Sequence, residues 1–171
     1  MRRRTLLAAS ASVAGLFGLG RRLTAFGEEP AHMALALAAP TASFAVTKTD
    51  AEWRRLLTPA QYAILRHQAT EPPESSPLDH EFRKGTYFCV GCDLTLFSSE
   101  TKFDSGTGWP SFYQPLDKAV GTSDDDSYFM HRTEVHCSRC GGHLGHVFND
   151  GPPPTGLRYC MNGTVLAFRP A

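Results

Sequence analysis

The chain has no excess of charge of either sign. Its 171 residues include 17 Lys and Arg against 17 Asp and Glu, so the formal net charge at pH 7 is zero. Nucleic-acid-binding domains usually carry clustered basic residues, so this balance gives no indication of a nucleic acid partner. Charged residues make up only 20% of the chain, and phenylalanine alone contributes 11 residues. This composition is typical of a globular protein and excludes a disordered one.

Long apolar runs and internal repeats are scarce as well. The apolar stretch from Leu6 to Leu19 is too short for a comfortable membrane span. The chain is long enough for one domain with a sizeable core and too short for two ordinary ones. We therefore expect a single domain, in a monomeric protein.

The first residues are predicted to be an export signal. Arg2, Arg3 and Arg4 precede the apolar stretch, as in a signal peptide. The Arg-Arg-x-Leu-Leu arrangement resembles a twin-arginine signal, which directs the export of folded proteins. Residues 1–38 are the expected signal, cleaved near Ala36-Leu37-Ala38, and the periplasm is the expected location. The alternative is an uncleaved N-terminal membrane anchor.

Helices are expected only near the start of the remaining chain. Residues 39–49 are interpreted as a linker, and residues 50–171 as the domain. Asp50 can cap a short helix that carries Trp53, and Thr58-Pro59-Ala60-Gln61 is a typical second helix start. Prolines at positions 72, 73 and 77 are expected to end helical structure.

Short strands dominate the rest of the predicted domain. Gly, Pro and Asp separate the strand candidates, which are 86–88, 94–97, 128–136, 146–149, 157–161 and 164–168. This pattern predicts a mainly β fold, with small antiparallel sheets forming a barrel-like or sandwich core. The acidic run Asp124-Asp125-Asp126 is interpreted as a solvated turn, because no calcium-loop pattern surrounds it.

The five cysteines divide into two pairs and one single residue. Cys89-Val-Gly-Cys92 and Cys137-Ser-Arg-Cys140 are two Cys-x-x-Cys pairs, and Cys160 is alone. Two such pairs can complete a tetrahedral site of four thiolates, as in a zinc ribbon. One structural zinc ion is the expected cofactor, although four thiolates also accept iron. The alternative interpretation is that the two pairs form two disulfides or two redox dithiols.

Two histidines complicate this assignment. His143 and His146 follow Cys140 closely, so a local Cys-Cys-His-His cluster is an alternative metal site. That alternative would leave Cys89 and Cys92 without a role. A catalytic zinc hydrolase is less compatible with the sequence, because it needs an open coordination position and an all-cysteine site is closed.

Cys160 is a candidate nucleophile because of its neighbours. An unpaired thiol near arginine and histidine can ionise and attack, whereas a lone cysteine in an apolar stretch is more often a small buried hydrophobe. In the upstream segment Lys102 to Phe112, glycines hold Trp109 on a loop. Trp109 is either an exposed aromatic platform or a structural core residue.

In combination, these segments resemble the methionine sulfoxide reductase B family over roughly residues 50–170. The matching segments are Tyr87 to Cys92, Lys102 to Phe112, Cys137 to Cys140, His143 to Phe148, Asp150-Gly-Pro, and Gly156 to Asn162. The resemblance implies reduction of the R epimer of methionine sulfoxide in oxidised proteins, with a purely structural zinc ion. It also implies small antiparallel sheets with helices mainly near the N-terminus.

The resemblance also implies roles for individual residues. Cys160 is similar to the family's nucleophile, which becomes a sulfenic acid, and Trp109 to the platform for the substrate's methyl group. His146, with His143, is similar to the residues that bind and protonate the sulfoxide oxygen. The residues similar to those that orient this group are Asn162, Asp150 and Arg158.

One position departs from the family pattern. Thr107 stands where many family members carry a resolving cysteine, and the four other cysteines are assigned to the metal. We therefore expect an external reductant, either a thioredoxin-like protein or a small-molecule thiol. A non-catalytic zinc-ribbon binding module is the rival function, but it gives no role to the histidines or to Cys160.

Overall fold

The structure, a computed structural model, describes residues 43–171. The predicted export signal and the first residues of the predicted linker lie outside this range. Residues 43–49 form no helix or strand, but they contact the domain: the Val46 amide donates to the Arg139 carbonyl over 2.9 Å, and the Phe44 ring lies edge-on to His136. Among the described residues, no helix is long and apolar enough to cross a membrane.

Two short helices open the described chain, as predicted. Helix α1 (Asp50–Leu56) is capped by Thr49, one residue before the predicted cap. Helix α2 (Pro59–His67) is capped by Thr58, and Gln61 completes the predicted capping box. This helix ends at His67, and its C-cap residue Gln68 adopts a left-handed conformation, before the first of the predicted proline stops.

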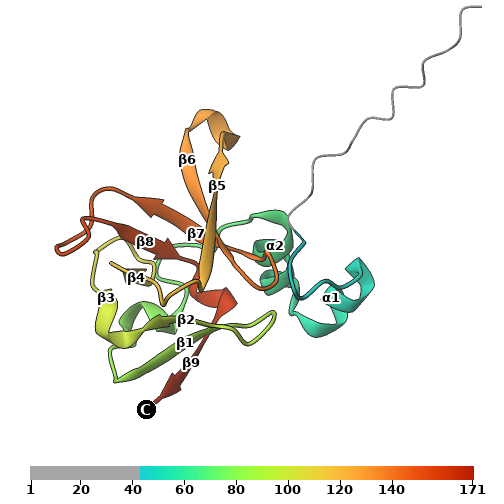
Figure 1. Cartoon of the computed structure of the whole chain (residues 1–171), viewed down its shortest axis with the longest axis horizontal. Helices are drawn as coiled ribbons and strands as arrows, with labels where there is room; N and C mark the ends of the chain where they lie inside the picture. The colour runs from blue at the N-terminus through green and yellow to red at the C-terminus, as the bar shows by residue number, and fades with distance from the viewer. Residues whose placement is uncertain (1–42) are drawn as a thin grey trace, which may run out of the picture. The chain divides into compact units, whose positions relative to one another are not determined.

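Two antiparallel sheets form the rest of the fold (Figure 1). The smaller sheet has the strand order β2 (Thr95–Ser98), β1 (Gly85–Cys89), β9 (Leu166–Pro170). The larger has the order β3 (Lys102–Phe103), β4 (Ser111–Phe112), β8 (Arg158–Met161), β7 (His143–Phe148), β6 (Arg132–Cys137), β5 (Val120–Asp125). Short 3-10 helices interrupt the strands: η1 (Pro77–His80), η2 (Ser99–Thr101), η3 (Ser127–Phe129) and η4 (Gly163–Val165). The predicted mainly β architecture is confirmed.

Several predicted strand boundaries are wrong. The candidate 128–136 overlaps η3, and its strand begins only at Arg132. The candidate 164–168 likewise overlaps η4, and β9 starts at Leu166. Strand β5 was not predicted because its sequence, VGTSDD, alternates weakly and ends in acidic residues. It is paired along its whole length with β6, so its strand conformation depends on that partner.

Packed aromatic rings fill the space beside the two sheets. Tyr87, Phe97 and Phe112 are completely buried, with ring centroids 4.3 Å apart for Phe97 and Phe112 and 4.9 Å apart for Tyr87 and Phe112. Full burial of one such side chain contributes about 1.5–3 kcal/mol. This cluster joins β1 and β2 of the smaller sheet to β4 of the larger one. The cluster therefore anchors β4, which pairs with β8, the strand that carries Cys160.

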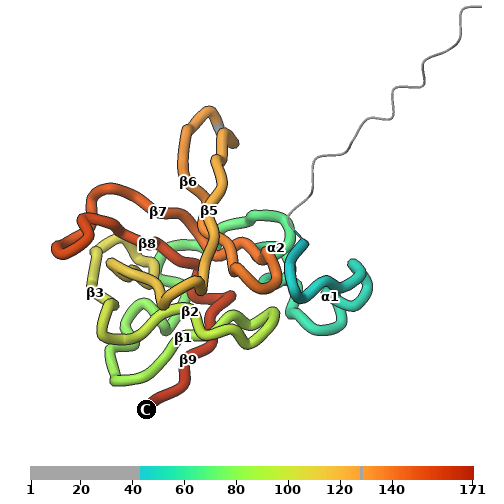
Figure 2. Tube along the Cα trace, in the orientation of Figure 1, coloured from blue at the N-terminus to red at the C-terminus, as the bar shows by residue number. Residues whose placement is uncertain are grey.

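Strands β5 and β6 form a hairpin that projects from the rest of the molecule (Figures 1 and 2). Their pairing runs from Val120 and Cys137 at the base to Asp125 and Arg132 near the tip. The hairpin thus connects the second cysteine pair to a set of charged side chains at its outer end.

Candidate active site

Four cysteines form a metal centre at one end of the sheets. The ligand atoms of Cys89, Cys92, Cys137 and Cys140 all lie within 4.8 Å of one another. The closest sulfur pairs are 3.8 Å apart for Cys89 and Cys140 and 3.4 Å apart for Cys92 and Cys137. Zinc–sulfur bonds of about 2.3 Å in a tetrahedron place the sulfurs about 3.8 Å apart. The four thiols therefore fit a structural zinc ion, as predicted.

The two cysteine pairs are built by matching turns. The Cys89 amide donates to the Leu94 carbonyl, and the Cys137 amide donates to the Gly142 carbonyl. The last residue of each turn has a left-handed backbone, at Asp93 and at Gly141. A Cβ on Gly141 would collide with the Phe44 ring, so glycine is required there. Each turn directs its two sulfurs towards the shared centre.

The histidines do not belong to this metal centre. Among the described residues, the candidate metal group contains the four cysteines alone. His143 and His146 are instead paired with carboxylates, as described below. The Cys-Cys-His-His alternative is therefore wrong.

Cys160 lines a separate cavity of about 150 Å³. Strand register explains its neighbours: Cys160 lies on β8 opposite Ser111 of β4 on one side and opposite His146 of β7 on the other. Burial raises the pKa of the Cys160 thiol, and the positive charge of Arg158 opposes that rise. The cavity is lined by Thr70, Trp109, Arg132, Gly145, His146, Phe148, Cys160, Met161 and Asn162.

Asp125 holds His146 at the wall of this cavity. The His146 Nε2 atom is 2.7 Å from a carboxylate oxygen of Asp125, which also accepts from Arg132 over 2.6 Å. The pKa of Asp125 lies well below its usual range, so this carboxylate is ionised. The hydrogen bonds from Ser127 are the largest cause, and the hydrogen bond from His146 is the next. An ionised carboxylate only accepts, so Nε2 carries the proton and Nδ1 is the nitrogen available to a ligand. Burial lowers the pKa of His146, against the opposing effect of Asp125.

Asp125 belongs to the acidic run that the sequence suggested was a solvated turn. That interpretation is wrong for Asp125, whose side chain is mostly buried at the outer end of β5. Because β5 is joined to β7 through β6, an acidic residue of the hairpin reaches a histidine 21 positions further along the chain. The sequence contains no local signal of this pairing.

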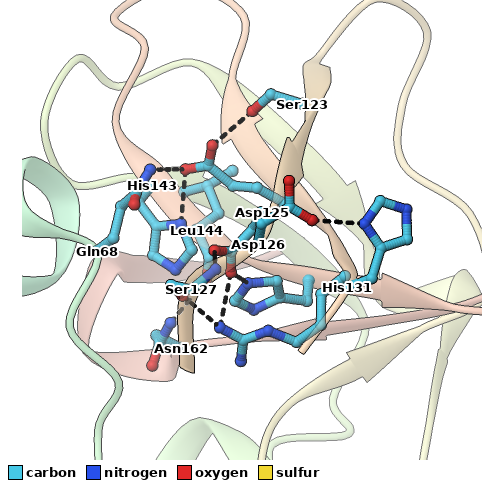
Figure 3. Close-up of polar contacts among 12 residues, drawn as sticks. Gln68, Ser123, Asp125, Asp126, Ser127, His131, His143, Leu144 and Asn162 are labelled. Atoms are coloured by element: carbon cyan, nitrogen blue, oxygen red, sulfur yellow. Dashed lines mark hydrogen bonds and ion pairs between the residues drawn. The ribbon is translucent and has the colours of Figure 1, made fainter. Parts of the chain in front are cut away.

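Glu134 holds His143 in the same way. The His143 Nδ1 atom lies 2.8 Å from Glu134, which also accepts from Gln68 and Ser123. Figure 3 draws these contacts as dashed lines, with His143, Gln68 and Ser123 labelled. The hydrogen bond with His143, followed by the one from Ser123, lowers the pKa of Glu134 to about 2. His143 is buried, its Nε2 atom has no hydrogen-bond partner among the described residues, and its ring centroid is 5.3 Å from that of His146.

Glu71 ties together the elements around Cys160. Its carboxylate accepts from the backbone amides of Gly163 and Thr164, over 2.6 and 2.7 Å. Its own amide donates to the Asn162 side chain over 2.9 Å, and its carbonyl accepts from the Trp109 indole over 3.1 Å. Asn162 in turn donates to the Leu144 carbonyl on β7. Glu71 therefore fixes two predicted site residues, and sequence reasoning missed it.

Arg158 and Asp150 form an ion pair beside Phe148. The Arg158 guanidinium makes two hydrogen bonds, of 2.8 and 2.9 Å, to Asp150, whose side chain is largely exposed. The same guanidinium lies over the Phe148 ring, 4.5 Å from its centroid. The positive charge of Arg158 lowers the pKa of Cys160. The two hydrogen bonds to Asp150 orient the Arg158 guanidinium. The histidines are oriented by Asp125 and Glu134.

Comparison with known proteins agrees with this geometry. Residues 57–170 match the model of the SelR domain. Proteins named peptide methionine sulfoxide reductase MsrB are similar over most of the chain: one from Leptospira interrogans is 55% identical over 128 residues, covering 74% of this chain and 98% of that protein. One from Agrobacterium fabrum is 55% identical over 126 residues, covering 73% and 93%. One from Pseudomonas putida strain W619 is 56% identical over 126 residues, covering 73% and 95%.

Proposed function

The chain belongs to the SelR-domain family of peptide methionine sulfoxide reductases, and we propose the roles that its residues take in that reaction. The protein is an oxidoreductase that reduces the R epimer of methionine sulfoxide in proteins to methionine. The observation that carries the residue assignment is the position of Cys160, which shares one small cavity with Trp109, His146 and Asn162.

Cys160 is the nucleophile of this reaction. The oxygen atom passes from the sulfoxide to Cys160: the S–O bond of the substrate breaks, an S–O bond to Cys160 forms, and methionine leaves. The substrate sulfur gains two electrons and the Cys160 sulfur loses them, giving a sulfenic acid. The attacking form is the thiolate. Arg158 favours this form, because its charge opposes the effect of burial on the Cys160 pKa.

His146 is the acid that makes the sulfoxide reactive. The sulfoxide is a poor electrophile until its oxygen receives a proton, so attack and protonation must coincide. With Nε2 engaged by Asp125, protonated His146 presents an Nδ1–H donor for the oxygen. His143 packs against the His146 ring and supports its position.

Trp109 and Phe148 supply the apolar wall for the methyl group. Both rings line the cavity, and Glu71 fixes the Trp109 indole through its carbonyl. A cavity of about 150 Å³ suits the end of one methionine sulfoxide side chain. The rest of an oxidised protein would lie outside it, which agrees with a substrate presented on a chain.

The electron donor is proposed to be an external thiol. The sequence has five cysteines, and four form the metal centre. A disulfide between Cys160 and one of these would remove a metal ligand. A thioredoxin-like protein or a small-molecule thiol is therefore expected to attack the sulfenic acid directly, releasing water and forming a mixed disulfide.

Reduction of resolved epimers tests the assignment. A peptide containing either the R or the S epimer of methionine sulfoxide is incubated with zinc-loaded protein and dithiothreitol. We expect consumption of the R epimer by the wild-type protein and none by Cys160→Ser. Turnover by Cys160→Ser, at unchanged zinc content, would disprove the role of Cys160.

We also propose that the protein is exported to the periplasm by a twin-arginine signal in residues 1–38. The support is the order of Arg3-Arg4-Thr5-Leu6-Leu7 before a weakly apolar stretch. Export after folding would deliver the metal centre with its thiols already occupied. Fractionation of cells that express the chain and an Arg3→Lys, Arg4→Lys variant tests this: cytoplasmic retention of the wild-type chain would contradict it.

A further inference from the structure

The outer end of the β5–β6 hairpin carries two neighbouring apolar side chains. Within the described part of the chain, the large apolar residues that are exposed are Leu56, Phe82, Phe129 and Met130. Two of these four are adjacent, in the segment that joins β5 to β6 where the hairpin projects furthest (Figures 1 and 2). Single exposed apolar side chains are ordinary, whereas a group of them often marks a contact site for another molecule.

The backbone at Phe129 points in the same direction. Phe129 has a φ of 58°, in the left-handed region that bulky residues rarely adopt. Its ring is fully exposed, so the strained backbone gains no burial in this fold in return. Strain of this kind clusters at active sites and at segments that hold a ligand.

The alternation of side chains places Met130 on the cavity side of the hairpin. Arg132 lines the cavity and donates to Asp125. The residue before it, His131, instead contacts Asp126 over 2.6 Å, and neither of these two lines the cavity (Figure 3). Met130 has an extended backbone, with φ −118° and ψ 141°. The alternation along an extended chain therefore predicts that the Met130 side chain returns to the side of Arg132.

Met130 is thus one step outward from the mouth of the cavity. Residues two apart in an extended chain are about 6.6 Å apart, which is the step from Arg132 to Met130. Met130 does not line the cavity, which has a volume of about 150 Å³ and holds the end of one side chain. It can therefore contact only a part of the substrate that the cavity leaves outside.

An extended substrate has the same spacing as the hairpin. When the oxidised methionine side chain enters the cavity, the side chains two positions away point the same way, each about 6.6 Å along the substrate. One of them is then within reach of Met130.

We propose that Met130, with Phe129 beside it, docks substrate polypeptides that carry an apolar side chain two positions from the oxidised methionine. This inference rests on the proposed function and adds a preference among its substrates. A methionine side chain is unbranched and flexible, so it packs against apolar side chains of different shapes. Such a contact suits an enzyme whose substrates differ in sequence around the oxidised residue.

Three substrates test this preference, with dithiothreitol as the reductant. Two are capped pentapeptides with R methionine sulfoxide at the centre and glycine on each side of it, with leucine at both ends in one and serine at both ends in the other. The third is N-acetyl methionine sulfoxide amide, which reaches only the cavity. We expect the wild-type protein to prefer the leucine peptide by about tenfold in kcat/KM, equivalent to about 1.4 kcal/mol. Partial burial of one leucine side chain supplies a preference of this size.

Met130→Gln is the test variant, because it keeps the length of the side chain and makes it polar. We expect the preference for leucine to fall to about twofold, with turnover of the minimal substrate unchanged, and Met130→Leu should keep the preference. Leu56→Gln is the matched control, since Leu56 lies on α1 and is 52% exposed, against 48% for Met130. No preference in the wild type, an unchanged preference in Met130→Gln, or an equal loss in Leu56→Gln would overturn the proposal.

Binding separates this inference from the proposed function, because it needs no turnover. The affinity of both pentapeptides for Cys160→Ser is measured by calorimetry, with and without Met130→Gln. Tighter binding of the leucine peptide that Met130→Gln removes would support the docking surface, and equal affinities would overturn it. Failure of the wild-type protein to reduce the minimal substrate would instead count against the proposed function.

Two other occupants of this surface would give different results. A thioredoxin-like protein is supplied as the reductant for the minimal substrate, and sedimentation reports the oligomeric state. A raised KM for that reductant in Met130→Gln, with an unchanged peptide preference, would assign the surface to the reductant. A dimer that Met130→Gln dissociates would assign it to a second copy of this chain. Either result would overturn the proposal.

Discussion

Removal of the Glu71 carboxylate is expected to affect both stability and catalysis. The carboxylate is buried and accepts from the amides of Gly163 and Thr164, in the turn that directly follows Asn162. In Glu71→Ala, both amides lose the acceptor that they have in this structure. In Glu71→Gln, one oxygen remains, without the charge.

The size of the effect follows from these contacts. Leaving one buried donor unpaired costs about 1–3 kcal/mol, so Glu71→Ala should lower the free energy of unfolding by about 2–6 kcal/mol. Hydrogen bonds to a charged acceptor are roughly twice as strong as neutral ones. Glu71→Gln, which keeps one neutral acceptor, should therefore have an intermediate effect of about 1–3 kcal/mol.

Urea denaturation of the zinc-loaded protein measures this, with Glu100→Ala as the control for losing an exposed carboxylate. The two Glu71 variants should also lose about tenfold in kcat/KM for the peptide sulfoxide, because the turn beside Cys160 is no longer fixed. A loss of stability below about 0.5 kcal/mol in Glu71→Ala, the size of an ordinary surface substitution, would refute this reasoning.

Three further predictions concern the hairpin carboxylates and the metal. Asp125→Asn removes the charge that raises the His146 pKa, so the alkaline limb of the kcat/KM pH profile should move to lower pH. Asp126→Asn is the control: it loses only an exposed contact with His131, so the alkaline limb should stay in place. Because the Glu134 pKa is lowered to about 2, its stabilising effect is present above about pH 4.5 and is lost as the pH falls towards 2. Acid titration of unfolding should therefore show about 3 kcal/mol less pH dependence in Glu134→Gln than in the wild type. Removal of the metal with a chelator should unfold the protein, measured by circular dichroism, because the four thiols are joined only through that ion.

Local patterns were sufficient to predict the helices and the metal ligands. The Thr58 capping box is encoded in four consecutive residues, and the structure has it as predicted. Each cysteine pair is likewise a local turn, so its two sulfurs converge whatever the rest of the chain does. The register of β7 and β8 places His146 opposite Cys160. Both strands were predicted from the sequence, and the structure adds that they are neighbours in the sheet.

The orienting carboxylates could not be predicted, because they depend on pairings between distant segments. Glu71 precedes two prolines in a stretch without regular structure, and its partners lie 92 and 93 positions away. Asp125 stands in a run of three acidic residues that looks like a typical surface turn. Only the pairing of β5 with β6 separates it from its neighbours and turns its side chain towards His146.

The same arrangement makes the hairpin a means of controlling the acid in the active site. Asp125 and Arg132 are opposite each other at the end of the β5–β6 ladder, and Glu134 lies two residues further along β6. The two carboxylates therefore face the same side of the hairpin and contact His146 and His143 respectively. A slip of β5 by one residue against β6 would turn the Asp125 carboxylate away from His146, while Glu134 would stay in place through the pairing of β6 with β7. The proton affinity of His146 thus depends on the pairing of β5 with β6, although neither strand carries the nucleophile.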